Sequence, residues 1–316
     1  MYFTNFTESC LAWGAGTRYN SVAAGHPVCR GKAESIPMAL CFAAVVLILA
    51  ALTVFLVAPG RPRRPLRTPF LHYNFAHRGL FTQDQSIPEN SLPAFAAAVA
   101  CGCGIELDVQ FTADRQLVVF HDDTLDRMTG ATGWVRDHTW QQIQGLSLAG
   151  TACTPPLFAR ALEEIGGRVP LIVEIKSRQE YGGAYLDALC TATLQALQTY
   201  AGPYCIESFD PRVVRRIRRM APGVLRGQLA DSYRANRRLG VHPVHAFLIS
   251  HCFGNFLGRP DFIAWCPERE NGAVALCRAM GAMMVQWTIL PQHDHKACQR
   301  RYDALIFQWY SPAPRY

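Results

Sequence analysis

The chain has 316 residues, of which 50% are hydrophobic and 17% are charged, so it can bury a sizeable core. The formal net charge is +7, but the basic residues are dispersed or lie in two clusters, 61–67 and 212–219, without any groove-reading motif, which argues against nucleic-acid binding. The twelve cysteines show neither the spacing of a disulfide scaffold nor the paired spacing of a zinc site. They favour a reducing compartment.

The first element in chain order is an uncharged apolar run over residues 36–58. A membrane-crossing helix needs about 20 such residues, and we interpret the run as a single transmembrane helix. The alternatives are a buried core helix and a cleaved signal peptide, but Pro59, Gly60 and arginines follow the run instead of small residues. Because the arginines of segment 61–67 outnumber the basic residues before the run, the positive-inside rule predicts a single-pass protein whose domain after the run lies in the cytoplasm.

Two segments flank this run. Residues 1–35 contain no clear motif, so we assign them no role, and translation starting at Met38 is one explanation for them. Residues 59–69 contain four prolines and are predicted to form a stiff spacer between the bilayer and the next domain. Residues 70–316 are predicted to be one domain.

From Phe70 onward, short apolar runs alternate with helical segments, which is typical of a parallel sheet covered by helices. The length suits an α/β fold of one TIM (β/α)8 barrel after the transmembrane helix. There are more strand candidates than barrel positions, so one is misread or lies outside the barrel. Segment 123–156 is polar and contains glycine, which suggests an insertion over the barrel mouth. The predicted strands are 73–77, 104–109, 117–121, 170–175, 204–207, 225–229, 262–265, 283–287 and 304–307, and the predicted helices are 91–100, 158–165, 184–200, 211–220 and 272–280.

Three carboxylates lie on two of the predicted strands. Glu106 and Asp108 are two residues apart, so their side chains share one face of a strand. Glu174 lies on another strand, in the sequence Glu-Ile-Lys. Barrel enzymes place their chemistry at the carboxyl ends of strands, and an all-oxygen ligand set suits a hard cation, whereas zinc usually recruits sulfur or imidazole. The sequence therefore predicts a Ca²⁺ or Mg²⁺ site.

Two histidines and two cations close further apolar runs. The unperturbed imidazole of histidine titrates near neutrality, so of His77 and His121 one could accept a proton from an attacking hydroxyl while the other donates to a leaving alkoxide. Arg78 and Lys176 supply the positive charge that a phosphodiester requires. Taken singly, each of these residues is more often a surface or ion-pair residue. Their combination with the carboxylates predicts a metal-assisted phosphodiesterase.

In their order along the chain, the motifs resemble those of the glycerophosphodiester phosphodiesterase family, bacterial type with an N-terminal membrane anchor, over essentially all of residues 70–316. The resemblance implies a TIM barrel, a Ca²⁺ or Mg²⁺ cofactor, and cleavage of a glycerophosphodiester to sn-glycerol 3-phosphate and an alcohol through a cyclic phosphate. It also implies metal ligands at Glu106, Asp108 and Glu174 and a catalytic pair at His77 and His121. The motifs are His77-Arg78-Gly79, Pro88-Glu89-Asn90-Ser91, Glu106-Leu107-Asp108, His121-Asp122, Glu174-Ile175-Lys176 and Ser208-Phe209.

The same resemblance predicts substrate contacts by Arg78, Lys176, Glu89, Asn90 and Trp287. The sequence around Glu89 and Asn90 is also typical of a helix N-cap. Where the family often has an acidic residue after the final strand, this chain has Gln308, which we expect to alter the head-group end of the pocket.

Two other functions stay open from the sequence. One is cleavage of lysophospholipids at the membrane, and the other is a silent phosphate-binding module, against which the intact motifs argue. The predicted partners are the small-molecule glycerophosphodiester substrate and the membrane. The sequence indicates no obligate protein partner.

Overall fold

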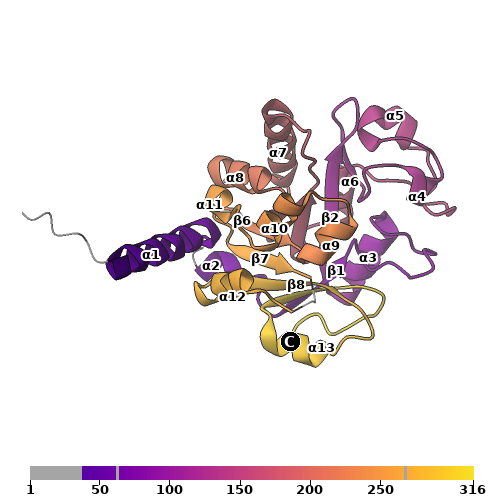
Figure 1. The fold of residues 1–316 in the computed structure, drawn as a ribbon. Coiled ribbons are helices and arrows are strands. Elements are labelled where there is room, and N and C mark those ends of the chain that lie inside the picture. The colour runs from indigo at the N-terminus through magenta and orange to yellow at the C-terminus, as the bar shows by residue number, and fades with distance from the viewer. Residues whose placement is uncertain (1–37, 62–63, 267–268) are drawn as a thin grey trace, which may run out of the picture. The chain divides into compact units, whose positions relative to one another are not determined.

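A computed structural model of the protein describes residues 38–61, 64–266 and 269–316 (Figure 1). The chain divides into two compact units, residues 1–45 and 46–316. Each unit is described by itself. Residues 1–37 of the first unit lie outside the described residues. The expectations for residues 1–35, including a translation start at Met38, concern this part of the chain. The second unit contains the last turns of α1 and everything that follows.

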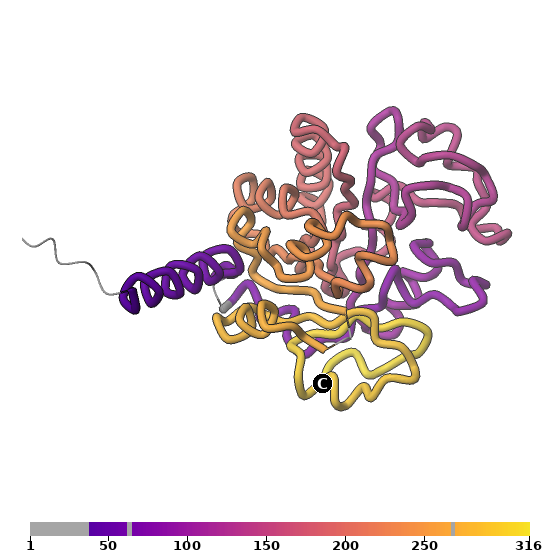
Figure 2. Tube along the Cα trace, in the orientation of Figure 1, coloured from indigo at the N-terminus to yellow at the C-terminus, as the bar shows by residue number. Residues whose placement is uncertain are grey.

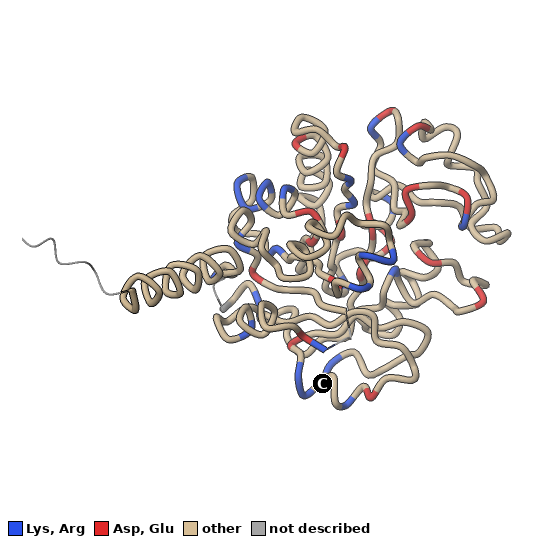
Figure 3. Tube along the Cα trace, viewed as in Figure 1, with Lys and Arg blue, Asp and Glu red and all other residues tan. Residues whose placement is uncertain are grey.

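Helix α1 (Met38–Val57) confirms the predicted apolar N-terminal helix. Its 20 residues have a mean hydropathy of 3.0, so it is long and apolar enough to cross a membrane. A signal sequence near the N-terminus has the same character. The figure coloured by charge shows no Lys, Arg, Asp or Glu along it (Figure 3).

The segment after α1 differs from the predicted stiff spacer. Part of it is helical, as α2 (Arg64–Arg67), and the Gly60 N–H donates to the Pro260 carbonyl at 2.7 Å. A stiff extended spacer would make no such bond with the barrel domain. The prediction is therefore wrong for the described part of residues 59–69.

Eight parallel strands close a barrel, which confirms the predicted TIM fold. Strand β1 pairs with both β9 and β2, and this double pairing joins the two ends of the sheet. The sequences of these strands are almost continuously apolar, because a strand of a parallel barrel is buried both by the barrel interior and by the surrounding helices. They are β1 (Tyr73–His77), β2 (Gly104–Phe111), β4 (Leu171–Ile175), β5 (Tyr204–Ser208), β6 (Leu225–Ala230), β7 (Phe262–Trp265), β8 (Met283–Ile289) and β9 (Ala304–Phe307).

Helices follow most of the strands, and α9 to α11 form an additional helical segment between β6 and β7 (Figure 2). Helix α9 packs against α10, and α11 packs against α8. This helical segment was not predicted from the sequence. The helices after α2 are α3 (Leu92–Cys101), α4 (Asp126–Thr129), η1 (Val135–Asp137), α5 (Trp140–Ile143), α6 (Phe158–Ile165), α7 (Gly183–Leu197), α8 (Pro211–Met220), α9 (Tyr233–Arg238), α10 (Pro243–Ser250), α11 (Asn255–Gly258), α12 (Gly272–Ala279) and α13 (His295–Arg301).

The ninth strand, β3 (Leu117–Val119), lies outside the barrel. It pairs antiparallel with the far half of β2, with Val109 opposite Val119. The sequence predicted a strand over 117–121 and one strand candidate too many for the barrel; β3 is the strand outside, and it ends at Val119, two residues before His121. The hairpin brings the chain back toward the barrel mouth, where the Phe120 N–H donates to the Asp108 carbonyl at 3.1 Å.

The segment between β3 and α6 has an apolar core of its own. Its side chains form a cluster separate from the two clusters of the barrel, which the polar character of the sequence did not reveal. Short helices α4 and α5 carry part of this cluster. The buried members are Val118, Phe120, Leu125, Met128, Val135, Ile143 and Leu148.

Alternate positions on the strands point into the barrel, and the lower inward layers are apolar. Phe75 and Phe262 are fully buried there. Gly104 and Gly227 make room for them, because a Cβ on either glycine would lie 2.4 or 2.1 Å from the neighbouring phenylalanine ring. This apolar cluster fills the barrel below the polar residues at the carboxyl ends of the strands.

Candidate active site

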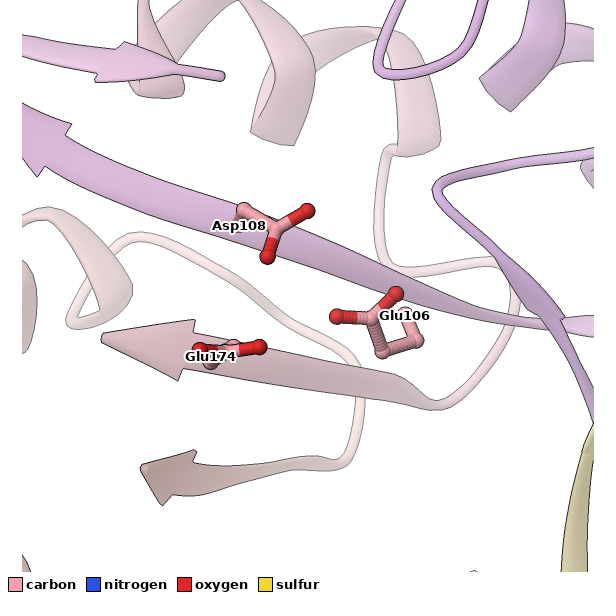
Figure 4. Close-up of side chains that lie close together, drawn as sticks. All are labelled: Glu106, Asp108 and Glu174. Carbon is pink, nitrogen blue, oxygen red and sulfur yellow. The ribbon is translucent and has the colours of Figure 1, made fainter. Parts of the chain in front are cut away.

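The barrel brings the three predicted carboxylates together (Figure 4). Glu106 and Asp108 come from β2, and Glu174 lies beside Asp108 in register on β4. One oxygen from each lies within 4.8 Å of the others, and the three residues are 2, 1 and 7% exposed. Burial and mutual repulsion raise the pKa of Glu106 and of Glu174 above their ordinary values. A hard divalent cation would remove this repulsion, so the carboxylates fit the predicted kind of ligand.

Positive and neutral donors surround Asp108. Lys176 Nζ lies 3.4 Å from Asp108 Oδ1 and 3.0 Å from Glu174 Oε1. The Asn90 amide donates to Asp108 Oδ2 at 2.9 Å, and Arg78 Nε is 3.8 Å from the same oxygen. Burial alone would raise the pKa of Asp108, but the charges of His121, Lys176 and Arg78 hold it well below its ordinary value. Asp108 is therefore the ionised centre of the cluster.

Two residues in the left-handed backbone region shape this corner of the site. Arg78 has φ of 55° and Asn90 has φ of 54°, an arrangement that costs about 1 kcal/mol or more for non-glycine residues. The Asn90 N–H donates to the Arg78 carbonyl at 2.9 Å, which locks the two turns together. Ser91 caps helix α3 through its side chain. The helix-cap interpretation of the Pro-Glu-Asn-Ser motif thus applies to Ser91, whereas Asn90 donates to the carboxylate of Asp108.

His77 lies at the end of β1 between a carboxylate and an amide. Its Nδ1 is 2.6 Å from Gln308 Oε1, and because an amide oxygen only accepts, Nδ1 carries the proton. Its Nε2 lies 3.9 Å from Glu106 Oε2. Burial, with the nearby charge of Arg78, lowers the pKa of His77 to about 3. His77 is therefore neutral near pH 7, with Nε2 able to accept a proton. Gln308, expected to line the head-group end, contacts this histidine instead.

Replacing Gln308 with glutamate is expected to raise the pKa of His77, because a carboxylate on Nδ1 stabilises the imidazolium. A base must be unprotonated to act, so the acid limb of the kcat/KM profile should move to higher pH. Activity near pH 5 should then fall more than activity near pH 8. The matched control is Gln83→Glu, at an exposed position. A pH profile of Gln308→Glu identical to that of the parent would contradict this link.

His121 is held by a chain of ion pairs that reaches the other side of the site. Its Nδ1 lies 2.7 Å from Asp122 Oδ1, and Arg127 Nε donates to Asp122 Oδ2 at 2.6 Å. Arg127 also donates to Glu89 at 2.6 Å, and Glu89 accepts from Arg78 at 2.7 Å. Glu89 thus lies behind Arg78 and orients it. Arg127 was not predicted, because only the folded insertion brings it to this position.

Glu207 is a second residue that sequence reasoning missed. It is 2% exposed and lies in register with Glu174 on the next strand. Among the described residues, its Oε2 has no hydrogen-bond partner. Burial, together with the charges of Glu174 and Asp108, raises the pKa of Glu207 well above its ordinary value. An acidic residue inside the apolar run of β5 was the signal available in the sequence.

Trp287 lies at the rim of the barrel interior, where it was predicted to contact substrate. Its ring meets Phe209 edge-on at 5.6 Å between centroids. Within the described part of the chain its indole N–H has no acceptor. A donor of this kind is available to a hydroxyl or phosphate oxygen of a ligand.

A TIM barrel with buried carboxylates, cations and two histidines at the carboxyl ends of its strands defines a hydrolase of phosphate esters. Residues 77–307 match the sequence profile of the Glycerophosphoryl diester phosphodiesterase family, and the chain belongs to that family. It is accordingly a phosphoric diester hydrolase that acts on glycerophosphodiesters.

Known proteins similar to the chain support this assignment. A glycerophosphodiester phosphodiesterase of Caldanaerobacter subterraneus is 31% identical over 231 residues, which cover 69% of this chain and 86% of that protein. Glycerophosphodiester phosphodiesterase 1 of Bos taurus is 32% identical over 162 residues, 48% of this chain and 46% of that protein. A solved Oleispira antarctica phosphodiesterase in complex with sn-glycerol-3-phosphate shares the fold, with a TM-score of 0.60, 21% identity, and coverage of 76% of this chain and 94% of that one.

Proposed function

We propose that the protein hydrolyses glycerophosphodiesters to sn-glycerol 3-phosphate and an alcohol, with a divalent metal and two histidines. The observation that carries this proposal is the buried group of Glu106, Asp108 and Glu174 within 4.8 Å of one another, with His77 beside it. The complex of the Oleispira antarctica phosphodiesterase with sn-glycerol-3-phosphate supports the product.

The three carboxylates would hold Ca²⁺ or Mg²⁺, which when bound lowers the pKa of a hydroxyl and offsets charge at phosphorus. His77 Nε2 then accepts the proton of a substrate glycerol hydroxyl as that hydroxyl attacks phosphorus. His121, oriented by Asp122, donates a proton to the departing alcohol. Water opens the resulting cyclic phosphate with the two proton transfers reversed.

The cations and the indole are assigned to substrate binding. Arg78 is held in place by Glu89 and Lys176 by Glu174, so both charges are oriented before substrate arrives. They would neutralise the phosphodiester, and the Trp287 N–H would bond the glycerol or the head group. Asn90, through its bond to Asp108, keeps that carboxylate in position.

We also propose that α1 anchors residues 70–316, as the catalytic domain, on the cytoplasmic side of a membrane. Arginines follow α1 closely, and buried cysteines such as Cys190 and Cys205 suit a reducing compartment. Labelling of an added Cys at Gln83, which is exposed, tests this orientation in intact cells. Labelling of Gln83→Cys by a membrane-impermeant maleimide above the level of the parent protein, without permeabilisation, would contradict it.

Chelation is expected to abolish hydrolysis by the full-length protein in detergent. Release of glycerol 3-phosphate from glycerophosphocholine and glycerophosphoethanolamine is measured with Mg²⁺ or Ca²⁺ and again after removal of the metal. Activity that returns when metal is added back supports the proposal, because the three carboxylates would then bind the metal that hydrolysis requires. Activity that survives chelation contradicts the metal, and silence on both substrates favours a phosphate-binding module.

A further inference from the structure

The basic cluster at residues 212–219 divides into two groups on helix α8 (Figure 3). Arg212 and Arg216 form ion pairs, both at 2.7 Å, with Asp210 and Asp187. The other arginines are exposed and form no ion pair with a carboxylate among the residues that the structure describes. They lie three and four positions apart, so they share one face of the helix. This α8 basic face consists of Arg215, Arg218 and Arg219.

Helix α11 connects α8 to the end of α1. Helices α8 and α11 pack against each other. The Asn255 amide, at the start of α11, donates to the Val57 carbonyl at 2.9 Å, and Arg259 donates to the Ala58 carbonyl at 2.9 Å. All of these contacts lie within residues 46–316. Carbonyls at the end of a helix have no partner within the helix, and here the catalytic domain supplies the donors. The end of α1 is therefore fixed to the domain.

Positive charge gathers around this end of α1. Burial, with the charge of Arg218, lowers the pKa of Arg259 and of Arg226, so the α8 basic face acts on the residue that caps α1. Arg61, which follows α1 closely, is also exposed. Like charges that are gathered in this way repel one another, and an anion relieves the repulsion. The surface around the end of α1 therefore favours a negatively charged partner.

The length of α1 determines where this surface lies in the anchored protein. Its 20 residues extend about 30 Å, which is about the thickness of the hydrocarbon core of a bilayer. Val57, its last residue, is fully buried in the domain. No part of the helix is left to form a stalk. The surface around the end of α1 must therefore lie at the level of the lipid head groups.

From these observations we propose that the α8 basic face binds the anionic phospholipid head groups of the bilayer that α1 crosses. The inference rests on the proposed membrane anchor and adds a second contact to it. Guanidinium groups donate hydrogen bonds to phosphate oxygens, often two at a time. Each arginine near an anionic bilayer surface strengthens binding by about fivefold. Contact at two places holds the barrel in one orientation relative to the membrane.

The test measures how fast single arginines of the full-length protein react with a water-soluble dicarbonyl reagent, p-hydroxyphenylglyoxal, as mapped by mass spectrometry. The protein is held in nanodiscs of phosphatidylcholine, either alone or mixed with phosphatidylglycerol. Modification of Arg215, Arg218 and Arg219 should be about fivefold slower in the anionic discs, and high salt should remove the difference. Arg238 and Arg300, exposed on other helices, should react equally in both discs.

Paired substitutions test whether the α8 basic face acts as a unit. Arg218→Gln combined with Arg219→Gln should remove most of the protection of Arg215, because the attraction to the bilayer is shared by the three charges. The matched control combines Arg238→Gln with Arg300→Gln. It removes the same amount of charge from other surfaces and should leave the protection of Arg215 unchanged.

The outcomes separate the contact from the anchor. Failure of the full-length protein to enter either kind of disc overturns the anchor and the contact together. Entry into both, with equal modification rates for the α8 basic face, overturns the contact and leaves the anchor and the proposed hydrolysis intact. Protection of Arg215 that survives the double substitution on α8 would also overturn the proposal, because it would not depend on the shared charge.

Discussion

Replacing Asp108 with asparagine is expected to weaken metal binding by at least about a hundredfold and to abolish hydrolysis at ordinary metal concentrations. Asparagine keeps the shape of the side chain but removes the charge that a hard cation requires. The same change removes the negative charge that faces Lys176 and Arg78, so the metal-free protein should also lose stability at neutral pH. Metal titration by calorimetry and Tm in chelator measure the two effects.

A matched control removes a different buried charge in the same layer. Glu207→Gln relieves repulsion with Glu174 and Asp108, so, unlike Asp108→Asn, it should raise the Tm of the metal-free protein, while metal binding stays close to that of the parent. Normal metal affinity in Asp108→Asn would exclude Asp108 from the metal site. Loss of metal binding in Glu207→Gln would instead add Glu207 to the ligands.

Replacing His121 with alanine is expected to lower kcat by about a hundredfold to ten-thousandfold, with metal binding largely unchanged because the imidazole is not one of the three clustered ligands. The defect should depend on the leaving group. A p-nitrophenyl diester of glycerol 3-phosphate releases a phenolate that needs little protonation, so this substrate should lose far less activity than glycerophosphocholine.

Comparison with His242→Ala controls for the removal of an exposed histidine, and that variant should act on both substrates like the parent. An equal loss on both substrates in His121→Ala would contradict the assignment of His121 as the general acid. Full activity of His121→Ala would remove the residue from the mechanism.

The parts of the fold that the sequence predicted are those specified locally. Helix α8 begins and ends where it was predicted, because Asp210 caps its start and a proline follows that cap. The alternation of Glu106 and Asp108 likewise placed both side chains inside the barrel. Helices α9 and α11 are too short for a clear helical period. Helix α10 is as long as α6 but lacks its amphipathic pattern, so the sequence did not reveal these helices.

The contacts within the site that could not be predicted join residues far apart in the chain. Gln308 meets His77 across 231 positions, and Arg127 meets Glu89 across 38 positions. Such pairs depend on how the barrel closes and on how the insertion folds against it. No local pattern encodes either event, so the sequence predicted the chemical groups but not their hydrogen-bond partners.

Phenylalanine side chains fill the barrel below the carboxylates, so the active site is open only at the carboxyl ends of the strands. Phe75 and Phe262 are fully buried beneath the carboxylates, so substrate, water and both products share one opening. In the proposed route, the water that opens the cyclic phosphate must arrive from the position that the alcohol has left. The geometry therefore imposes an order on the catalytic cycle: the alcohol departs first, and the phosphate-bearing product leaves last.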